Sequence, residues 1–135
     1  MDNIFGELFK YGFHDTEISS IEGEGLEIKL KFYKGIYLLD ENGKETTLSK
    51  PAQVTLYINT YFDSFEESFE IKEYGKKIKY LDYAMLKKYL EKEVFKIWMV
   101  YYSKFDSCIL FDGGISKKNI MLSIEGVNKI IIQEF

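Results

Sequence analysis

The single histidine and its neighbouring carboxylate are the residues best suited to acid–base chemistry. His14 is followed directly by Asp15, and a carboxylate beside an imidazole fixes its tautomer and supports proton transfer. Residues 13–18 are expected to lead into a strand, where adjacent side chains point to opposite faces, so the two side chains should not touch. We therefore interpret His14 as closing a turn through a hydrogen bond to the backbone, and Asp15 as beginning the strand.

The single cysteine is the other candidate for chemistry. Cys108 alternates with Asp106 and Leu110 along a predicted strand. A nucleophilic thiol needs a base or a positive charge that favours the thiolate, and only His14 could serve as that base. A free cysteine on a strand otherwise acts as a small apolar side chain. One cysteine excludes an internal disulfide and is typical of a reducing compartment, so we expect a cytoplasmic protein.

Motifs for nucleotide, metal and acyl-transfer chemistry are absent from the sequence. It contains no GxxxxGK[ST] loop, no GxGxxG fingerprint that opens a helix, no HExxH and no GxSxG. One histidine and one cysteine fall short of the four ligands that a structural zinc site requires. We therefore expect a protein that is not an enzyme, without catalytic residues, metal or cofactor.

Charge and hydropathy narrow the choice of partners. The 18 lysines against 22 acidic residues give a formal net charge of −4, and arginine is absent. Duplex-binding proteins usually have a basic excess and use arginine for bidentate contacts, so nucleic acid is not expected as a partner. No apolar stretch is long enough to cross a bilayer. Residues 1–10 lack a basic region before an apolar core, which argues against a secretory signal and against a membrane partner.

Carboxylates gather in two segments of the chain. The first surrounds a predicted hairpin and comprises Asp15, Glu17, Glu22, Glu24 and Glu27. The second follows a later predicted strand and comprises Asp63, Glu66, Glu67, Glu70 and Glu73. Paired carboxylates can hydrolyse glycosides or hold a metal ion. Acidic runs in loops are more often solvated surface, and a protein-binding patch is the next alternative.

The second acidic segment also contains aromatic residues, which favours a protein interface. Interfaces commonly combine aromatic anchors with a charged rim. The predicted partner-binding residues are Asp63, Phe65, Glu66, Glu67 and Phe69. On this hypothesis, Phe65→Ala and Glu66→Lys should each weaken binding without unfolding the protein.

Four other aromatic residues have an ambiguous orientation: Tyr57, Tyr61, Trp98 and Tyr102. On the solvent side they would form a patch for a partner, and on the inner side they would belong to the core. Trp98 lies in a segment that is apolar on both faces, residues 95–102, which predicts a central strand with Trp98 in the core.

Alternating apolar residues dominate the chain and predict an α+β domain that is mainly an antiparallel sheet. Leu26, Ile28, Leu30 and Phe32 share one face of a strand, and Gly23 to Gly25 connect residues 16–22 to 26–33 as a hairpin. About eight or nine strands are expected, arranged as a sandwich or an open barrel within one domain, residues 1–135.

Two helices are expected beside the strands. A short N-terminal helix would be capped by Asp2, would place Ile4, Phe5, Leu8 and Phe9 on one face, and would end at Gly12. A second helix is expected near residues 82–94, capped by Asp82, with an apolar stripe that includes Leu86 and Leu90.

One short element resembles a known group of proteins. The segment Phe13-His14-Asp15-Thr16-Glu17-Ile18, followed by an alternating strand and Gly35-Ile36-Tyr37, is similar to the N-terminal pattern of small bacterial proteins with an FHDxxI element. Some of them are classed as immunity proteins of polymorphic toxin systems. The similarity covers the first third of the chain. It implies a protein that binds and blocks one toxin, with His14 and Asp15 as the matching positions.

Three functional hypotheses remain open from the sequence. The first is a non-enzymatic protein-binding domain of the immunity type, with a protein toxin as partner. The second is a small-molecule-binding or enzymatic domain with a tyrosine-lined pocket between sheet and helix. The third is a structural subunit, such as a homodimer, that pairs through an exposed edge strand at residues 129–135.

Overall fold

Antiparallel β-sheets form almost the whole fold. The computed structural model describes residues 5, 6 and 8–135, and this part of the chain contains thirteen strands in three sheets. In order, the six-stranded sheet comprises β2 (Thr16–Ile18), β10 (Phe95–Ser103), β11 (Cys108–Ile115), β12 (Lys118–Ile124), β8 (Phe69–Tyr74) and β9 (Ile78–Leu81). The four-stranded sheet comprises β13 (Val127–Glu134), β7 (Ala52–Ile58), β4 (Glu27–Phe32) and β3 (Ser20–Glu24). A small third sheet comprises β1 (Tyr11–Gly12), β5 (Tyr37–Leu39) and β6 (Glu45–Leu48).

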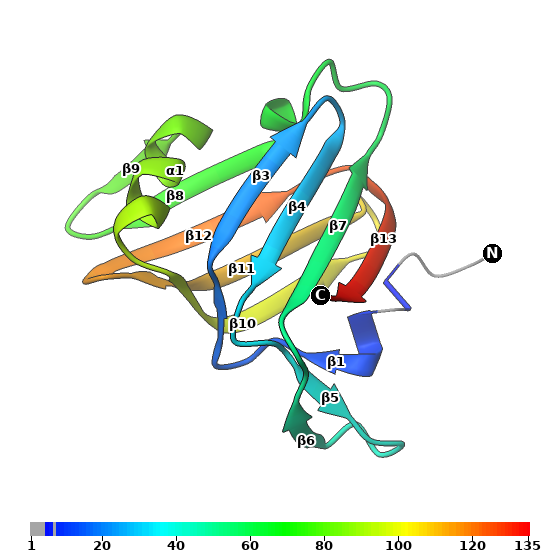
Figure 1. The fold of residues 1–135 in the computed structure, drawn as a ribbon. Coiled ribbons are helices and arrows are strands. Elements are labelled where there is room, and N and C mark those ends of the chain that lie inside the picture. The colour runs from blue at the N-terminus through cyan, green and yellow to red at the C-terminus, as the bar shows by residue number, and fades with distance from the viewer. Residues whose placement is uncertain (1–4, 7) are drawn as a thin grey trace.

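The two larger sheets face each other and enclose the core (Figure 1). The alternation of β4 buries Ile28, Leu30 and Phe32 completely, and β12 likewise buries Ile120 and Leu122 from the opposite sheet. Side chains at every second position of a strand share one face, so each large sheet contributes one apolar face to this core. The opposite faces of the two sheets look outward.

The expected α+β class and the barrel are wrong. The described chain is mostly β, with one α-helix, α1 (Tyr83–Lys92), and two short 3₁₀ helices, η1 (Leu8–Lys10) and η2 (Phe65–Ser68). The sheets do not close, because each has two edge strands. The expected eight or nine strands are too few. One reason is that the strand expected over residues 16–22 breaks at Ser19 into β2 and β3, which belong to different sheets.

The short N-terminal helix expected from Asp2 to Gly12 is only partly open to comparison. Asp2 and Ile4 lie outside the described residues. Where the structure describes this segment, η1 forms a single 3₁₀ turn, and the chain enters β1 directly after it. Phe5 and Leu8 are buried in the core, with exposed fractions of 0% and 3%. The apolar spacing therefore reports burial at Phe5 and Leu8, and the described residues of this segment contain one helical turn.

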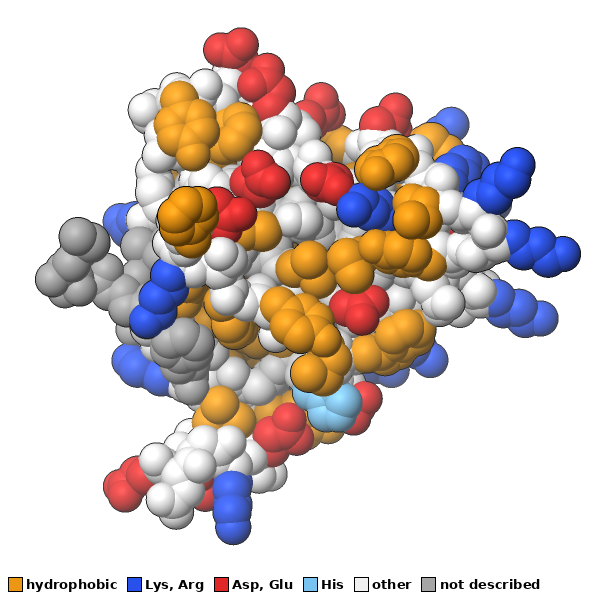
Figure 2. Space-filling view, turned by 180° about the vertical axis from the view of Figure 1, so that it is seen from behind, with side chains coloured by type: hydrophobic (Ala, Val, Ile, Leu, Met, Phe, Trp, Pro, Cys, Tyr) orange, Lys and Arg blue, Asp and Glu red, His pale blue; other side chains and the backbone are white. Residues whose placement is uncertain are grey.

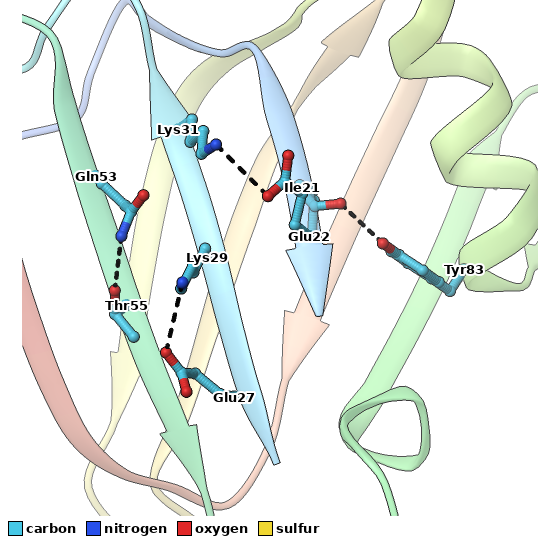
Figure 3. Close-up of polar contacts among 8 residues, drawn as sticks. All are labelled: Ile21, Glu22, Glu27, Lys29, Lys31, Gln53, Thr55 and Tyr83. Carbon is cyan, nitrogen blue, oxygen red and sulfur yellow. Dashed lines mark hydrogen bonds and ion pairs between the residues drawn. The ribbon is translucent and has the colours of Figure 1, made fainter. Parts of the chain in front are cut away.

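The helix expected near residues 82–94 is present as α1, and it packs against the edge strand β3. Asp82 caps it by accepting a hydrogen bond from the Met85 backbone N–H at 2.9 Å. Leu86 is completely buried. The Tyr83 hydroxyl donates to the Ile21 carbonyl of β3 at 2.9 Å, a contact drawn in Figure 3. The helix thus covers the edge of the four-stranded sheet, which would otherwise be open to pairing.

Candidate protein-interaction surfaces

His14 and Asp15 form an exposed polar pair in a turn. The Asp15 backbone adopts a left-handed conformation with φ of 59°, so the pair lies in a turn between β1 and β2. Asp15 Oδ2 lies 3.3 Å from His14 Nε2, and the two side chains are 67% and 57% exposed. The expectation that they do not touch is therefore wrong, because the strand begins only at Thr16. The expected backbone hydrogen bond of His14 is present, with Nδ1 bonded to the Trp98 carbonyl.

The contacts of His14 in this turn should make the stability of the fold depend on pH. The hydrogen bond to Trp98 is the largest cause that raises the pKa of His14 above its ordinary 6.5, and the charge of Asp15 is the second. A raised pKa in the folded state stabilises the fold fully below pH 6.5, and this stabilisation is lost as the pH rises through the folded pKa. An NMR titration of the imidazole should give a midpoint above 6.5. Asp15→Asn should lower that midpoint, and an unchanged midpoint would contradict the role of Asp15.

Cys108 lies in the six-stranded sheet, far from the turn that contains His14. It pairs with Ser103 at the far end of β10, five residues beyond Trp98, which places it about 16 Å along the strand from the histidine turn. Cys108 Sγ lies 3.0 Å from Ser123 Oγ, and burial raises the pKa of the thiol. The Cys108–His14 dyad considered from the sequence therefore does not form.

Four chain connections meet at one end of the molecule, which we call the acidic loop end. They are the end of β3 with its turn into β4 (24–26), the segment from β7 through η2 (59–68), the β10–β11 turn (104–107) and the β12–β13 turn (125–126). Backbone hydrogen bonds join them. The Phe65 N–H donates to the Gly25 carbonyl at 2.8 Å, the Val127 N–H donates to the Ser107 carbonyl at 3.0 Å, and the Asn59 N–H donates to the Gly126 carbonyl at 2.8 Å.

The acidic loop end has a strong excess of negative charge. Its exposed carboxylates are Glu24, Asp63, Glu66, Glu67, Asp106 and Glu125. Lys104 is the single lysine of these four connections. Two aromatic side chains project among the carboxylates, Tyr61 at 71% exposed and Phe105 at 100% exposed. The upper part of Figure 2 shows acidic and hydrophobic side chains interspersed on this part of the surface.

The structure separates the five predicted partner-binding residues into two groups. Asp63, Glu66 and Glu67 are exposed at the acidic loop end. Phe65 is only 8% exposed, and its ring packs edge-on against Tyr83 of α1 with centroids 5.0 Å apart. Phe69 is half-buried beside Phe65, and the centroids of the two rings are 5.7 Å apart. The carboxylates are therefore available to a partner, while the Phe65 ring supports the loop from inside.

The outer face of the four-stranded sheet is polar, and its charges are largely paired. Figure 3 shows Lys31 pointing to Glu22 and Lys29 pointing to Glu27, with nitrogen–oxygen distances of 3.5 Å and 4.0 Å. The Gln53 amide donates to the Thr55 hydroxyl two residues further along the same strand, β7, at 3.3 Å. Three carboxylates of the first acidic segment thus lie on or beside this solvated sheet face: Glu22, Glu24 and Glu27.

The outer face of the six-stranded sheet has more large apolar side chains, and it also carries the charged residues Lys96, Asp112, Lys72 and Glu70. The strand register places eight large side chains on it: Trp98, Met99 and Tyr101 from β10, Leu110 from β11, Met121 from β12, Tyr74 from β8, and Ile78 and Tyr80 from β9. Figure 2 views this face and shows hydrophobic side chains spread across its middle. A shallow hollow of about 270 Å³ crosses it between Leu110 and Met121 and extends to Asp106 and Glu125 of the acidic loop end.

A β-bulge explains why Trp98 lies on this outer face. The pairing of β10 with β11 shifts register between Ile97 and Met99, so Trp98 and Met99 both turn outward. The Trp98 ring covers Gly114, where an added Cβ would lie 3.1 Å from Trp98 Cζ2. Trp98 is 43% exposed, so its expected place in the core is wrong. The expected central position of its strand holds only for Phe95–Ile97, which pair on both sides.

The other three ambiguous aromatic residues lie on different surfaces. Tyr61 belongs to the acidic loop end. Tyr57 is half-buried on the outer face of the four-stranded sheet, where Lys129 lies 5.6 Å from its ring centroid. Tyr102 packs against Phe5 at 5.4 Å, and burial raises its pKa to about 12. The four aromatics therefore do not form one patch.

Sequence reasoning missed Met99, Phe105 and Asp112 as surface residues of interest. The bulge that turns Met99 outward leaves no period-2 signal, because it interrupts the alternation. Phe105 lies in the four-residue connection Lys104-Phe105-Asp106-Ser107 between two strands. The polar composition of that connection was the available signal for a turn with an exposed aromatic side chain.

Other classes of ligand would each need their own structural feature among residues 5, 6 and 8–135. Among those residues, no group of three or more His, Cys, Asp or Glu side chains is placed to hold a metal ion. A hollow of about 230 Å³ between β3 and α1 is lined by Ser20, Ile21 and Leu90 among others. A hollow of about 300 Å³ between η2, β8 and the start of α1 is lined by Tyr83 among others. No helix within residues 5, 6 and 8–135 has the length and apolar character needed to span a membrane. Comparison with family models, curated proteins and solved structures gave no significant match to this chain.

Proposed function

We propose that this protein is a non-enzymatic binding domain that recognises a basic surface of another protein through its acidic loop end. The observation that carries the proposal is the convergence of four connections that bring six exposed carboxylates, one lysine and two exposed aromatics together. Opposite charge steers association and fixes orientation, and exposed aromatic side chains supply the apolar contact area of an interface.

The arrangement of the loop end favours a protein partner. Its backbone is held by hydrogen bonds between separate connections, such as Glu125 N–H to the Ser68 carbonyl at 2.9 Å. A surface ordered before binding loses less conformational entropy when the partner docks. The separation of His14 from Cys108 also favours a function without catalysis.

In its finer form, the proposal is an immunity-type protein that acts in the cytoplasm and neutralises a bacterial toxin by direct binding. Its support is the FHDxxI element around His14 together with the acidic excess of the loop end. A protein that blocks a toxin by covering a basic active-site surface needs an acidic face of this kind. Self-association through the edge strand β13 is the alternative outcome of the experiment below.

Charge reversal at the acidic loop end should weaken partner binding. We expect Asp63→Lys combined with Glu66→Lys to weaken binding about tenfold or more, because attraction to a basic partner becomes repulsion. Glu67 is left unchanged, since its Oε2 accepts from the Asp63 backbone N–H at 3.1 Å and holds the loop. The measurement is affinity capture from host lysate on the wild-type and variant proteins, followed by titration of the captured partner.

The matched control makes the same change in net charge, but at positions away from the acidic loop end. Glu41→Lys combined with Glu91→Lys reverses two exposed carboxylates away from the loop end, one in the turn before β6 and one on α1. This double variant should retain the partner. Equal binding by both double variants would refute the loop end as the contact, and a protein that captures only its own copy would support self-association instead.

A further inference from the structure

We infer that the outer face of the six-stranded sheet binds an arginine side chain of a partner protein, with Asp112 as its acidic anchor and Trp98 as the adjoining aromatic surface. This site lies outside the acidic loop end, so it can be tested independently of the proposed function.

The inference begins with the surroundings of Asp112 on β11. The register places Met99 of β10 on one side of it and Met121 of β12 on the other. Along β11, its neighbours on the same face are Leu110 and Gly114, and Gly114 is covered by the Trp98 ring. Asp112 is half-buried. A carboxylate thus lies among mainly apolar side chains, with the exposed Lys96 of β10 opposite Gly114 on the same face.

Within the described residues, the Asp112 carboxylate has neither an ion pair nor a hydrogen bond. The lysine that shares its row, Lys72, is separated from it by Met121 of β12. That lysine is already engaged, with its Nζ 2.9 Å from Glu70 Oε1 and 5.7 Å from the Tyr80 ring centroid. A carboxylate beside apolar side chains gains from a cation that pairs with it, and the unpaired Asp112 leaves that position open to a cation of a partner.

Arginine fits these neighbours better than lysine. A guanidinium donates to a carboxylate in bidentate geometry and also stacks on an aromatic face. Asp112 and the Trp98 ring supply these two features on one face. The thioethers of Met99 and Met121 are polarisable and adapt to the stem of an incoming side chain. An arginine flanked by apolar residues therefore satisfies both the charge and the exposed apolar area.

A second copy of this chain is a poorer occupant than a different protein. This chain contains no arginine. In a symmetric dimer whose two-fold axis passes through the middle of this face, Asp112 would meet the Asp112 of the other copy, and the two like charges would repel. The inference therefore commits to a partner protein that presents arginine.

The test is an NMR titration of the full chain with the peptide acetyl-Leu-Arg-Leu-amide and with its citrulline counterpart, which has the same shape but no charge. We expect the arginine peptide to shift the Trp98 indole N–H and the Met99 and Met121 methyl signals, with a dissociation constant on the order of 1 mM. The citrulline peptide should bind about tenfold more weakly, because the charged hydrogen bonds are lost.

Two single variants distinguish a specific role of Asp112 from a general effect of negative charge on the protein. Asp112→Asn should remove the preference for arginine over citrulline, while Asp106→Asn, at the exposed β10–β11 turn, should keep it. The loop-end variant Asp63→Lys with Glu66→Lys should also keep it, so failure of the proposed function leaves this result intact. Equal binding of both peptides, a preference that survives in Asp112→Asn, or an absence of shifts at Trp98 would overturn the inference. A dimer in sedimentation analysis that Trp98→Ser dissociates would overturn it in favour of a second copy.

Discussion

Phe65→Ala is expected to lower the free energy of unfolding by about 3 kcal/mol. Phe65 is 8% exposed, and its ring lies directly over Gly23, where an added Cβ would be 2.3 Å from Phe65 Cζ. The same ring contacts Tyr83 of α1 and Phe69 of β8. Removing it leaves a cavity between the four-stranded sheet, α1 and β8, which loses both apolar burial and ring contacts.

The measurement is urea unfolding followed by circular dichroism, with Glu66→Ala as the matched control. Glu66 adjoins Phe65 in η2 but is exposed, so its replacement should change stability by about 0.5 kcal/mol or less. If Phe65→Ala were as stable as the control, Phe65 would not pack in the interior as described. The burial also replaces the expectation that Phe65→Ala weakens binding without unfolding, so charge reversals are the better probes of the loop end.

Gly113→Ala is expected to be at least as damaging, with a loss of about 3 kcal/mol or more. A Cβ on Gly113 would lie 1.9 Å from the Lys96 backbone oxygen and 3.0 Å from Phe95 Cε1. A backbone oxygen in a paired strand cannot move aside without separating β10 from β11. The bulge that turns Trp98 and Met99 outward lies directly beside this contact, so the apolar outer face should be disturbed as well.

The measurement combines thermal unfolding with fluorescence of Trp98, the only tryptophan. Gly113→Ala should lower the melting temperature and change the emission of the folded protein. Gly75→Ala is the control, because the nearest atom to its added Cβ is the Lys77 backbone oxygen at 3.9 Å, in an exposed turn. Equal melting temperatures for the two variants would show that β10 and β11 do not approach as closely as described.

The sequence by itself determined the local elements that have a strong periodic signal. The alternation of Ile28, Leu30 and Phe32 predicted a strand with one buried face, because the strand period of two is visible in the residues themselves. Asp82 and the apolar stripe through Leu86 predicted α1, because a cap and a 3.6-residue period are also local signals. The absence of catalytic motifs likewise needed no structure to be seen.

Only the tertiary structure decided which side chains are available for binding. The bulge after Ile97 puts Trp98 on the face opposite Val100 and Tyr102, and no periodicity reports an inserted residue. Phe65 looked like a surface anchor because its neighbours are acidic, yet a glycine distant in sequence, Gly23, leaves room for its ring inside. Asp112 gained its apolar neighbours from three strands. Exposure and charge pairing depend on contacts between distant segments, and those contacts are fixed only when the sheets assemble.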